Sequence, residues 1–362
     1  MQRISSVQII GSRHLGGAEM FYVRLVNALH LRGQPTLAVT AQCSLIAREL
    51  DSGLGQYHVA MRGIWDLPSR WRIQHLLARE RPDIVQTYMG RATRLTHVRL
   101  GHGPIHVARL GGYYNLKGYR HAHAWVGNTK GICDYLVRNG LPSARVCYIG
   151  NFVTPGVPTA PDTLAALRQR LGVPEEAWVL LAVGRLHPVK GFEDLLDALG
   201  HSPARVDGRP VHLVVVGDGP LAAGLQQQAY RLGLEGRVHW AGWQTDTTPY
   251  YDLADLFICP SRYEPLGNVV LEAWAQRRPV LSTRAAGPLE LARHGDNAWL
   301  VPLADPPALA QAIVHLLGDE ALRARLAEHG HRQVLRQHNQ EAIVEAYLAL
   351  YASLLERGTA PQ

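Results

Sequence analysis

Short runs of apolar and β-branched residues alternate with amphipathic stretches along most of the chain, at intervals of roughly 20 to 30 residues, a spacing typical of βαβ units. This alternation predicts parallel sheets with helices on their faces. Continuous apolar runs such as residues 213–216 favour strands that are buried on both faces. The predicted strands lie near residues 6–10, 36–40, 83–87, 104–108, 124–126 and 146–149, then 179–183, 212–216, 238–241, 256–258, 280–282 and 299–301.

A length of 362 residues exceeds the usual size of one hydrophobic core and predicts two domains. Residues 151–158 contain two prolines and a glycine, which forbid a long helix and favour an extended connection. We therefore predict two Rossmann-like, doubly wound α/β domains, over residues 1–152 and 153–338. A last helical stretch, residues 339–362, is predicted to cross back to the first domain. In such folds ligands bind at the carboxyl ends of the strands, here expected in a cleft between the domains.

The composition, 47% apolar and 19% charged residues, is that of a globular protein. Apolar runs are far shorter than the roughly 20 residues that cross a bilayer, and the first residues lack the pattern of a signal peptide. We therefore expect a cytoplasmic protein. Four widely spaced cysteines without a CxxC pair indicate neither a zinc site nor a disulfide framework, and the 18 histidines include no HExxH motif.

Charge is distributed unevenly along the chain. Residues 1–150 contain 19 Lys and Arg but only 7 Asp and Glu, a net charge of +12, whereas the remainder has a net charge of −5. This asymmetry indicates that the first half meets an anionic partner, such as nucleic acid, a phosphorylated saccharide or a membrane surface. A generally arginine-rich surface is the alternative explanation.

A glycine-bearing loop over residues 11–19 separates the first predicted strand from a helix that runs to about Leu31. Gly16 and Gly17 allow the backbone to approach a phosphate closely, and the free N–H groups of the helix supply partial positive charge. The loop matches neither GxGxxG nor a Walker motif. A tight strand-to-helix turn without a ligand explains it equally well.

Two cations follow the predicted strand 179–183, at Arg185 and Lys190. On a loop at the carboxyl end of a strand they can converge on one diphosphate, the arginine as a bidentate fork and the lysine as a point charge. This arrangement does what a divalent metal does elsewhere. The sequence contains no Asp-x-Asp pair to hold such a metal.

Residues 260–273 combine a loop with the start of a helix. Pro265 and Gly267 keep Glu264 on the loop, Asn268 is predicted to be the N-cap, and the helix is predicted from Val269 onward. The helix N-terminus can receive a phosphate or sugar oxygen, and Glu272, one turn further on, can reach a ribose diol. A capped helix with an incidental glutamate is the alternative.

Taken together, these motifs resemble those of the retaining family 4 glycosyltransferases of the GT-B fold. Glu264 and Glu272 form an E-x7-E pattern, and Gly16-Gly17-Ala18-Glu19, the loop over residues 184–191 and Val216-Gly217-Asp218-Gly219-Pro220 occur in the family's order. The resemblance covers nearly the whole chain. It implies a metal-independent enzyme that needs no cofactor and transfers a hexose from a UDP- or GDP-sugar to an acceptor.

The resemblance also implies roles for individual residues. Arg185, Lys190 and Glu264 would be catalytic, the two cations neutralising the donor diphosphate and the glutamate touching the transferred sugar. Gly16 and Gly17 would close over the diphosphate. The remaining predicted nucleotide-sugar ligands are Leu266, Gly267, Asn268 and Val269 through their backbone, Glu272 at the ribose, and Gly217 and Trp243 near the base.

One position departs from the family pattern, because Gly111 stands where many members have a histidine. The identity of any general base is therefore left open. Residues 112–120, together with Glu264-Pro265-Leu266-Gly267-Asn268, resemble members that build lipopolysaccharide core or surface glycans. An anionic glycan or glycolipid acceptor suits the basic half. Residues 61–72, with Trp65 and Trp71, can lie at the inner membrane surface as a peripheral contact. The alternative is an ordinary helix start with two partly buried tryptophans.

Two other functions are alternatives to the glycosyltransferase hypothesis. A sugar-nucleotide epimerase of the same architecture would use a sugar nucleotide without an acceptor. A non-catalytic basic protein would bind nucleic acid, but the sequence contains no recognition motif for it, so we expect no nucleic-acid partner.

Overall fold

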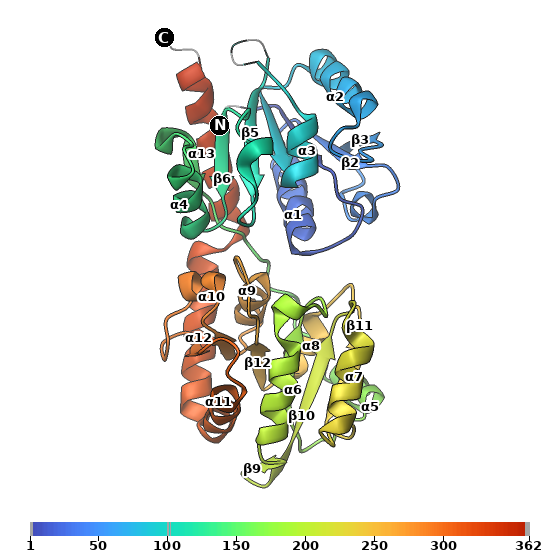
Figure 1. Cartoon of the computed structure of the whole chain (residues 1–362), viewed down its shortest axis with the longest axis vertical. Helices are drawn as coiled ribbons and strands as arrows, with labels where there is room; N and C mark the ends of the chain where they lie inside the picture. Colours follow the sequence, from blue (N-terminus) through green and yellow to red (C-terminus); the bar gives the residue numbers. More distant parts are fainter. Residues whose placement is uncertain (1–2, 100, 102, 359–362) are drawn as a thin grey trace. The chain divides into compact units, whose positions relative to one another are not determined.

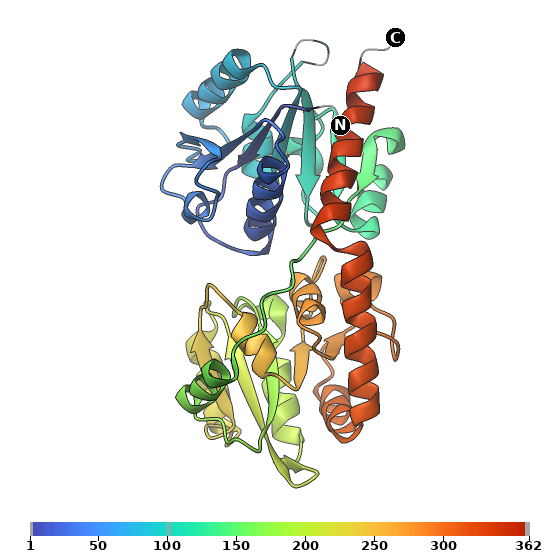
Figure 2. The same ribbon diagram turned by 180° about the vertical axis from the view of Figure 1, so that it is seen from behind.

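The computed structural model describes residues 3–99, 101 and 103–358 and divides the chain into two compact units (Figures 1 and 2). Unit 1 comprises Met1–Phe152 and Gln340–Gln362, and unit 2 comprises Val153–Asn339. The chain therefore changes unit after Phe152 and after Asn339, next to the predicted divisions after residues 152 and 338.

Unit 1 is built on a parallel sheet in the order β3-β2-β1-β4-β5-β6-β7. From β1 the chain adds strands first on one side, β2 and β3, and then on the other, β4 to β7, so the strand order reverses between β1 and β4. Ligands bind at such a reversal point in open α/β sheets. The strands are β1 (Ser6–Ile10), β2 (Thr36–Ala41), β3 (Gly55–Val59), β4 (Ile84–Tyr88), β5 (Ile105–Leu110), β6 (Ala124–Gly127) and β7 (Val146–Tyr148). The helices are α1 (Gly17–Leu31), α2 (Leu67–Glu80), α3 (Met89–Leu95), α4 (Lys130–Arg138) and α13 (Gln340–Gly358).

Unit 2 repeats this plan, with a main sheet in the order β11-β10-β8-β12-β13-β14 and the reversal between β8 and β12. Every pairing in that sheet is parallel, and a short strand β9 pairs antiparallel with the start of β10. The strands are β8 (Trp178–Val183), β9 (Arg205–Val206), β10 (Arg209–Val216), β11 (Val238–Gly242), β12 (Leu256–Cys259), β13 (Val280–Thr283) and β14 (Trp299–Val301). The helices are α5 (Pro161–Leu171), α6 (Phe192–His201), α7 (Ala222–Arg231), α8 (Thr248–Leu253), α9 (Asn268–Ala275), α10 (Ala286–Leu291), α11 (Pro306–Gly318) and α12 (Glu320–Gln337).

Both faces of each sheet are covered, which is why the strands are continuously apolar. Along β8, Leu180 belongs to one buried cluster and Leu181 to another, because successive side chains of a strand point to opposite faces. In unit 1, α13 packs on α1 and β5, as Figure 2 shows, and inserts Tyr347 and Tyr351 into the core. The parallel-sheet prediction is confirmed in both units.

Two strands were not predicted from the sequence. The edge strand β3 begins with a glycine and has half-exposed or exposed residues up to Val59, so it lacks an apolar signature. Strand β9 is two residues long and forms a hairpin with β10 through Asp207 and Gly208, both with positive φ.

The tryptophans of residues 61–72 are largely exposed, which differs from the partly buried tryptophans of the alternative interpretation. Trp65 is 85% exposed in the loop before α2, and Trp71 is 65% exposed on the helix. Within the described part of the chain, no helix has the length and apolar character needed to span a membrane.

Candidate active site

Most of the predicted site residues lie along one edge of the unit 2 sheet, where its parallel strands end. Arg185 follows β8 on the loop that contains the short helix η4 (Pro188–Lys190), and Gly217 follows β10. Trp243 follows β11, and Glu264 lies in the loop between β12 and α9. Because β8 and β12 are neighbours across the reversal of strand order, the cation-bearing loop and the glutamate-bearing loop lie next to each other.

Backbone hydrogen bonds tie these loops together. The Gly184 N–H donates to the carbonyl of Val216 at 2.9 Å, and the N–H groups of Arg262 and Tyr263 donate to the carbonyl of Val189 at 2.9 and 3.0 Å. Gly217 has a φ of +140°, and a Cβ there would lie 1.9 Å from the Gly184 carbonyl oxygen. The edge is therefore a continuous, closely packed backbone surface, which only glycine permits at position 217.

Lys190 and Glu264 form an ion pair across the reversal point, with the ammonium donating to Oε2 of the carboxylate. Glu264 is only 8% exposed, and its Oε2 also accepts from the Ser261 hydroxyl at 3.3 Å. Burial acts to lower the pKa of Lys190, but the charge and hydrogen bond of Glu264 outweigh burial and raise it above the usual value. The lysine therefore carries its positive charge at neutral pH.

Arg185, by contrast, is exposed, and its side chain makes no hydrogen bond or ion pair with the residues that the structure describes. Its guanidinium retains its donors for a ligand. A second ion pair, which the sequence analysis missed, joins Arg262 to Asp194 of α6 through two hydrogen bonds of 2.7 and 2.6 Å. This bidentate pair fixes the loop that carries Glu264 to the helix that follows Lys190.

The start of α9 differs from the prediction. Gly267, with a φ of +95°, is the N-cap, and Asn268 is the first helical residue, so the prediction of an Asn268 N-cap is wrong. The left-handed backbone at Gly267 brings the chain into the helix one residue earlier than a capping side chain would. No side chain caps α9 at Gly267. The preceding residue, Leu266, is buried, with 5% of its surface exposed.

Glu272 lies in α9, where the Tyr251 hydroxyl is 3.4 Å from its Oε2. Trp243 is 55% exposed, so its indole face is available to another ring. These two residues, like the amides at the start of α9, belong to the same edge of the sheet as the Lys190–Glu264 pair.

In unit 1, Gly16 is the N-cap of α1 and Gly17 its first residue, both exposed at the carboxyl end of β1. Gly16 has an extended backbone without a side-chain cap, and a Cβ there would lie 2.9 Å from Oε2 of Glu19. Gly111 follows β5, and a Cβ there would lie 3.5 Å from Nδ2 of Asn128. The glycine loop therefore places the N-terminus of α1 after the carboxyl end of β1.

Comparison with known proteins decides the family. A family model described as Glycosyltransferase Family 4 matches residues 15–156, and one described as Glycosyl transferases group 1 matches residues 177–319. The chain is 36% identical over 341 residues to the lipopolysaccharide core biosynthesis glycosyltransferase LpsE of Rhizobium meliloti (strain 1021), covering 93% of this chain and 96% of the relative. The chain belongs to the family 4 glycosyltransferases.

Further comparisons agree with this family 4 assignment. LpsD of the same organism, also named as a lipopolysaccharide core biosynthesis glycosyltransferase, is 33% identical over 350 residues, covering 95% of this chain and 96% of that relative. Among solved structures, Anabaena Alr3699/HepE in complex with UDP and glucose has a TM-score of 0.83 at 22% identity, covering 96% of this chain and all of that one. WaaG has a TM-score of 0.70 at 18% identity, covering 98% and 100%. These structures show that the family 4 enzyme has the GT-B fold.

The family assignment favours the predicted glycosyltransferase and gives no support to the epimerase alternative. It leaves the roles of individual residues in this family 4 enzyme as predictions. What sequence reasoning missed is the Arg262–Asp194 pair, for which the chain offers no local signal, because the two residues are 68 positions apart.

Proposed function

We propose that the enzyme is a retaining, metal-independent hexosyltransferase that uses a UDP- or GDP-sugar, without any further cofactor. The observation that carries the proposal is the Lys190–Glu264 ion pair at the reversal point of the unit 2 sheet. Arg185 lies on the same loop as Lys190, and its side chain has no partner among the described residues. A donor diphosphate needs positive charge, and the transferred sugar needs a hydrogen-bond acceptor. This edge offers both within two adjacent loops.

In the proposed reaction the bond between the anomeric carbon and the diphosphate breaks, and negative charge develops on the leaving phosphate. Lys190 has three N–H donors, so it can keep its bond to Glu264 while it donates to a phosphate oxygen. Arg185 supplies a second, bidentate contact. Fixed charges that stabilise a developing anion usually make the largest contribution to catalysis.

Other contacts of the donor follow from the same edge. The backbone amides at Leu266, Gly267, Asn268 and Val269 would receive phosphate and sugar oxygens, as expected of a helix N-terminus. Glu272 would accept from the ribose hydroxyls, and the exposed face of Trp243 would stack on the base beside Gly217. Gly16 and Gly17 would offer the backbone amides of the unit 1 glycine loop to a phosphate.

Retention of configuration would follow from attack on the face that the leaving group occupies, with a donor phosphate oxygen taking the acceptor proton. This route needs no protein base, which agrees with a glycine at position 111. The catalytic work of the chain is then charge stabilisation by Arg185 and Lys190 and orientation of the sugar by Glu264.

For the acceptor we propose a lipopolysaccharide-core or surface-glycan intermediate, an anionic glycan or glycolipid. LpsE and LpsD are named for lipopolysaccharide core biosynthesis, and the net charge of +12 in residues 1–150 suits such an acceptor. A peripheral contact with the cytoplasmic face of the inner membrane would follow from the same charge.

The test is a panel of UDP-, GDP- and ADP-sugars screened by thermal shift, followed by NMR of the product formed from the donor that binds. We expect one donor to raise the melting temperature, and the new linkage to keep the anomeric configuration of that donor. Turnover should survive an excess of EDTA. An inverted product would disprove retention, loss of turnover with EDTA would disprove metal independence, and a panel without any binding would disprove the donor class.

A further inference from the structure

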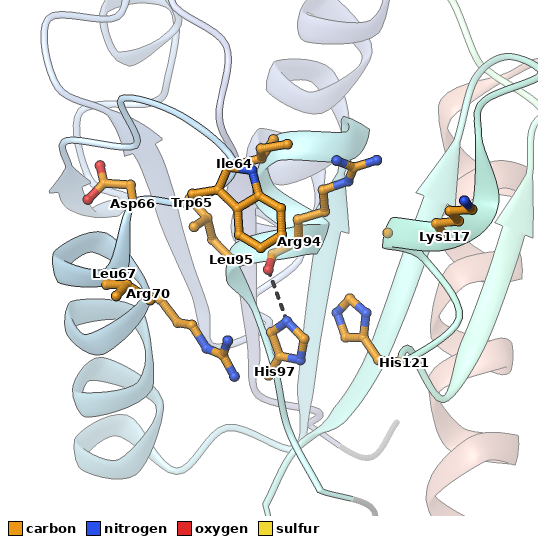
Figure 3. A pocket seen from close by; sticks show the side chains of 11 residues that line it. Ile64, Trp65, Asp66, Leu67, Arg70, Arg94, Leu95, His97, Lys117 and His121 are labelled. Carbon is orange, nitrogen blue, oxygen red and sulfur yellow. Dashed lines mark hydrogen bonds between the residues drawn. The ribbon is translucent and has the colours of Figure 1, made fainter.

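Unit 1 contains a cavity of about 400 Å³ that none of the predicted site residues line. It lies on the side of the sheet covered by α2 and α3, and it closes against the short helix η2 (Leu116–Gly118). Its volume is within the range of small-molecule sites. Figure 3 shows its lining, which comes from the start of α2, the end of α3, and the segment from η2 to His121.

Three cations contribute to the lining of this cavity, whose remaining surface is largely apolar. Arg70 enters from α2, Arg94 from α3 and Lys117 from η2 on the opposite side (Figure 3). The single acidic residue of the lining, Asp66, is the N-cap of α2, and it accepts from the Ser69 N–H at 3.1 Å and from the Ser69 hydroxyl at 2.7 Å. Asp66 is therefore already bonded to its own helix.

Across the residues with described positions, Arg70, Arg94 and Lys117 form no side-chain hydrogen bond or ion pair. Arg94 is held in place by packing, because it lies so close to Gly118 that a Cβ there would be 2.1 Å from its Nε. Arg94 and Lys117 lie on the η2 side of the cavity, whereas the guanidinium of Arg70 points toward His97 (Figure 3). The like charges of Arg94 and Lys117 repel each other, and an anion bound beside them relieves that repulsion.

The neutral part of the lining suits a ring. The indole of Trp65, which is 85% exposed, lies over the cavity in front of Arg94 (Figure 3). Opposite, His97 and His121 stack with their ring centres 3.9 Å apart, each hydrogen-bonded through Nε2 to backbone carbonyls of residues 93–96. An indole face beside a cluster of phosphate-binding side chains fits a molecule that carries both a ring and a phosphate.

We propose that this cavity is a second binding site, for a phosphorylated monosaccharide unit. The phosphate lies beside Arg94 and Lys117, and the sugar ring lies against Trp65. The second site rests on the proposed function only for the source of its ligand, because a glycan acceptor with phosphate substituents would supply the phosphorylated sugar. Binding itself requires neither a donor nor transfer.

Isothermal titration calorimetry of the full chain with glucose 6-phosphate tests the site, with glucose, inorganic phosphate and phosphatidylglycerol vesicles as separate titrations. We expect saturable binding of glucose 6-phosphate, weaker binding of inorganic phosphate and none of glucose. Lys190→Ala should leave this binding unchanged, because Lys190 belongs to the unit 2 edge. If glucose 6-phosphate does not bind, or if only the vesicles bind, the proposal is overturned.

Variants localise the binding. Arg94→Ala and the exposed Lys117→Ala should each weaken glucose 6-phosphate binding by about tenfold or more, since each removes a charge-assisted contact. Trp65→Ala should weaken glucose 6-phosphate but not inorganic phosphate. Arg72→Ala is the matched control, because Arg72 is exposed on the same helix as Arg70 and does not line the cavity. Equal losses in Arg72→Ala and Lys117→Ala would overturn the proposal.

The two proposals fail separately. If the cavity binds nothing while the enzyme consumes a sugar nucleotide, only the second site is wrong. If no sugar nucleotide binds or reacts while glucose 6-phosphate still binds through Arg94 and Lys117, only the donor proposal is wrong.

Discussion

The two sheets have the same strand order around their reversal points but use their polar residues in opposite ways. In unit 2 the charged side chains Lys190 and Glu264 lie on loops at the carboxyl edge. In unit 1 the polar residues next to the reversal lie within the strands. Tyr88 of β4 donates to Oε1 of Gln8 in β1 at 2.9 Å, and Tyr351 of α13 donates to Oε1 of Gln86 at 2.9 Å, all of them buried.

A buried cation extends this internal network in unit 1. Arg109 of β5 is 3% exposed, donates to the Tyr347 hydroxyl at 3.1 Å and to Oδ1 of Asn151, and lies 4.0 Å from the ring centre of Phe21. Tyr347 belongs to α13, Phe21 belongs to α1, and Asn151 lies near the end of residues 1–152. The same fold therefore uses polar groups to hold a distant helix in unit 1, whereas in unit 2 the proposed function assigns them to the donor.

The strongest test of this contrast is Lys190→Ala. We expect turnover to fall about 100- to 1000-fold, or roughly 2.7 to 4 kcal/mol of transition-state stabilisation, by analogy with the loss of one oxyanion donor. Arg185→Ala should act in the same direction. The measurement is kcat with the donor identified by thermal shift.

The control for Lys190→Ala is Arg231→Ala, since Arg231 is exposed at the end of α7, away from the loops of the carboxyl edge. Its turnover should equal that of the unmodified enzyme. Full turnover in Lys190→Ala would show that the unit 2 edge is not the diphosphate site.

Arg109→Met tests the other half of the comparison. It removes two charge-assisted hydrogen bonds and leaves Oδ1 of Asn151 buried without this donor, so we expect a loss of about 3 kcal/mol in unfolding free energy. Urea unfolding followed by circular dichroism measures it. At a temperature where the variant is folded, donor binding should be unchanged, whereas Arg72→Met should change neither quantity.

Only part of this contrast could be predicted from the sequence. The loops with Arg185, Lys190 and Glu264 stand out because charged residues follow apolar strands, a signal that is local in the chain. The pairing of Lys190 with Glu264 depends on β8 lying beside β12, which no local pattern encodes. Arg109 reads as one more basic residue in a strand, because its partners Asn151 and Tyr347 are 42 and 238 positions away.

A further prediction uses two glycines of unit 2 with nearly the same backbone conformation. Gly191, next to Lys190, has a φ of +65°, and a Cβ there would lie 2.2 Å from the Pro260 carbonyl oxygen, whereas Gly233 has a φ of +68° and open space around it. Both Gly→Ala variants should lose about 1 to 2 kcal/mol from the left-handed backbone. Gly191→Ala should lose roughly 2 kcal/mol more, as overpacking typically costs.

The two readouts for this pair are chemical denaturation and turnover. Because the clash at position 191 pushes the loop after β8 away from β12, Gly191→Ala should also reduce turnover. Gly233→Ala should leave it unchanged. Equal losses of stability in the two variants would mean that the close contact between these loops does not stabilise the unit 2 edge.

The smallest expected effect concerns acid stability of the unit 2 sheet away from its carboxyl edge. His212 of β10 hydrogen-bonds through Nδ1 to Nε2 of His239 on β11, at 2.8 Å. Burial, together with the neighbouring His239, lowers the pKa of His212 to about 4. The unfolded chain therefore binds more protons than the folded chain as the pH falls from about 6.5 towards 4, so stability decreases over that window. For one proton the slope cannot exceed about 1.4 kcal/mol per pH unit.

His212→Gln should flatten this pH dependence of the urea midpoint between pH 6.5 and 4, because glutamine can keep a hydrogen bond to His239 but does not titrate. The matched control is His201→Gln, since His201 is exposed at the end of α6 and has no ring neighbour on β10. If His212→Gln and the unmodified enzyme show the same acid slope, the His212–His239 pair is not what makes this part of unit 2 sensitive to acid. In that case the polar groups within the unit 2 sheet, unlike those within unit 1, contribute little to stability, and the contrast between the two units becomes sharper.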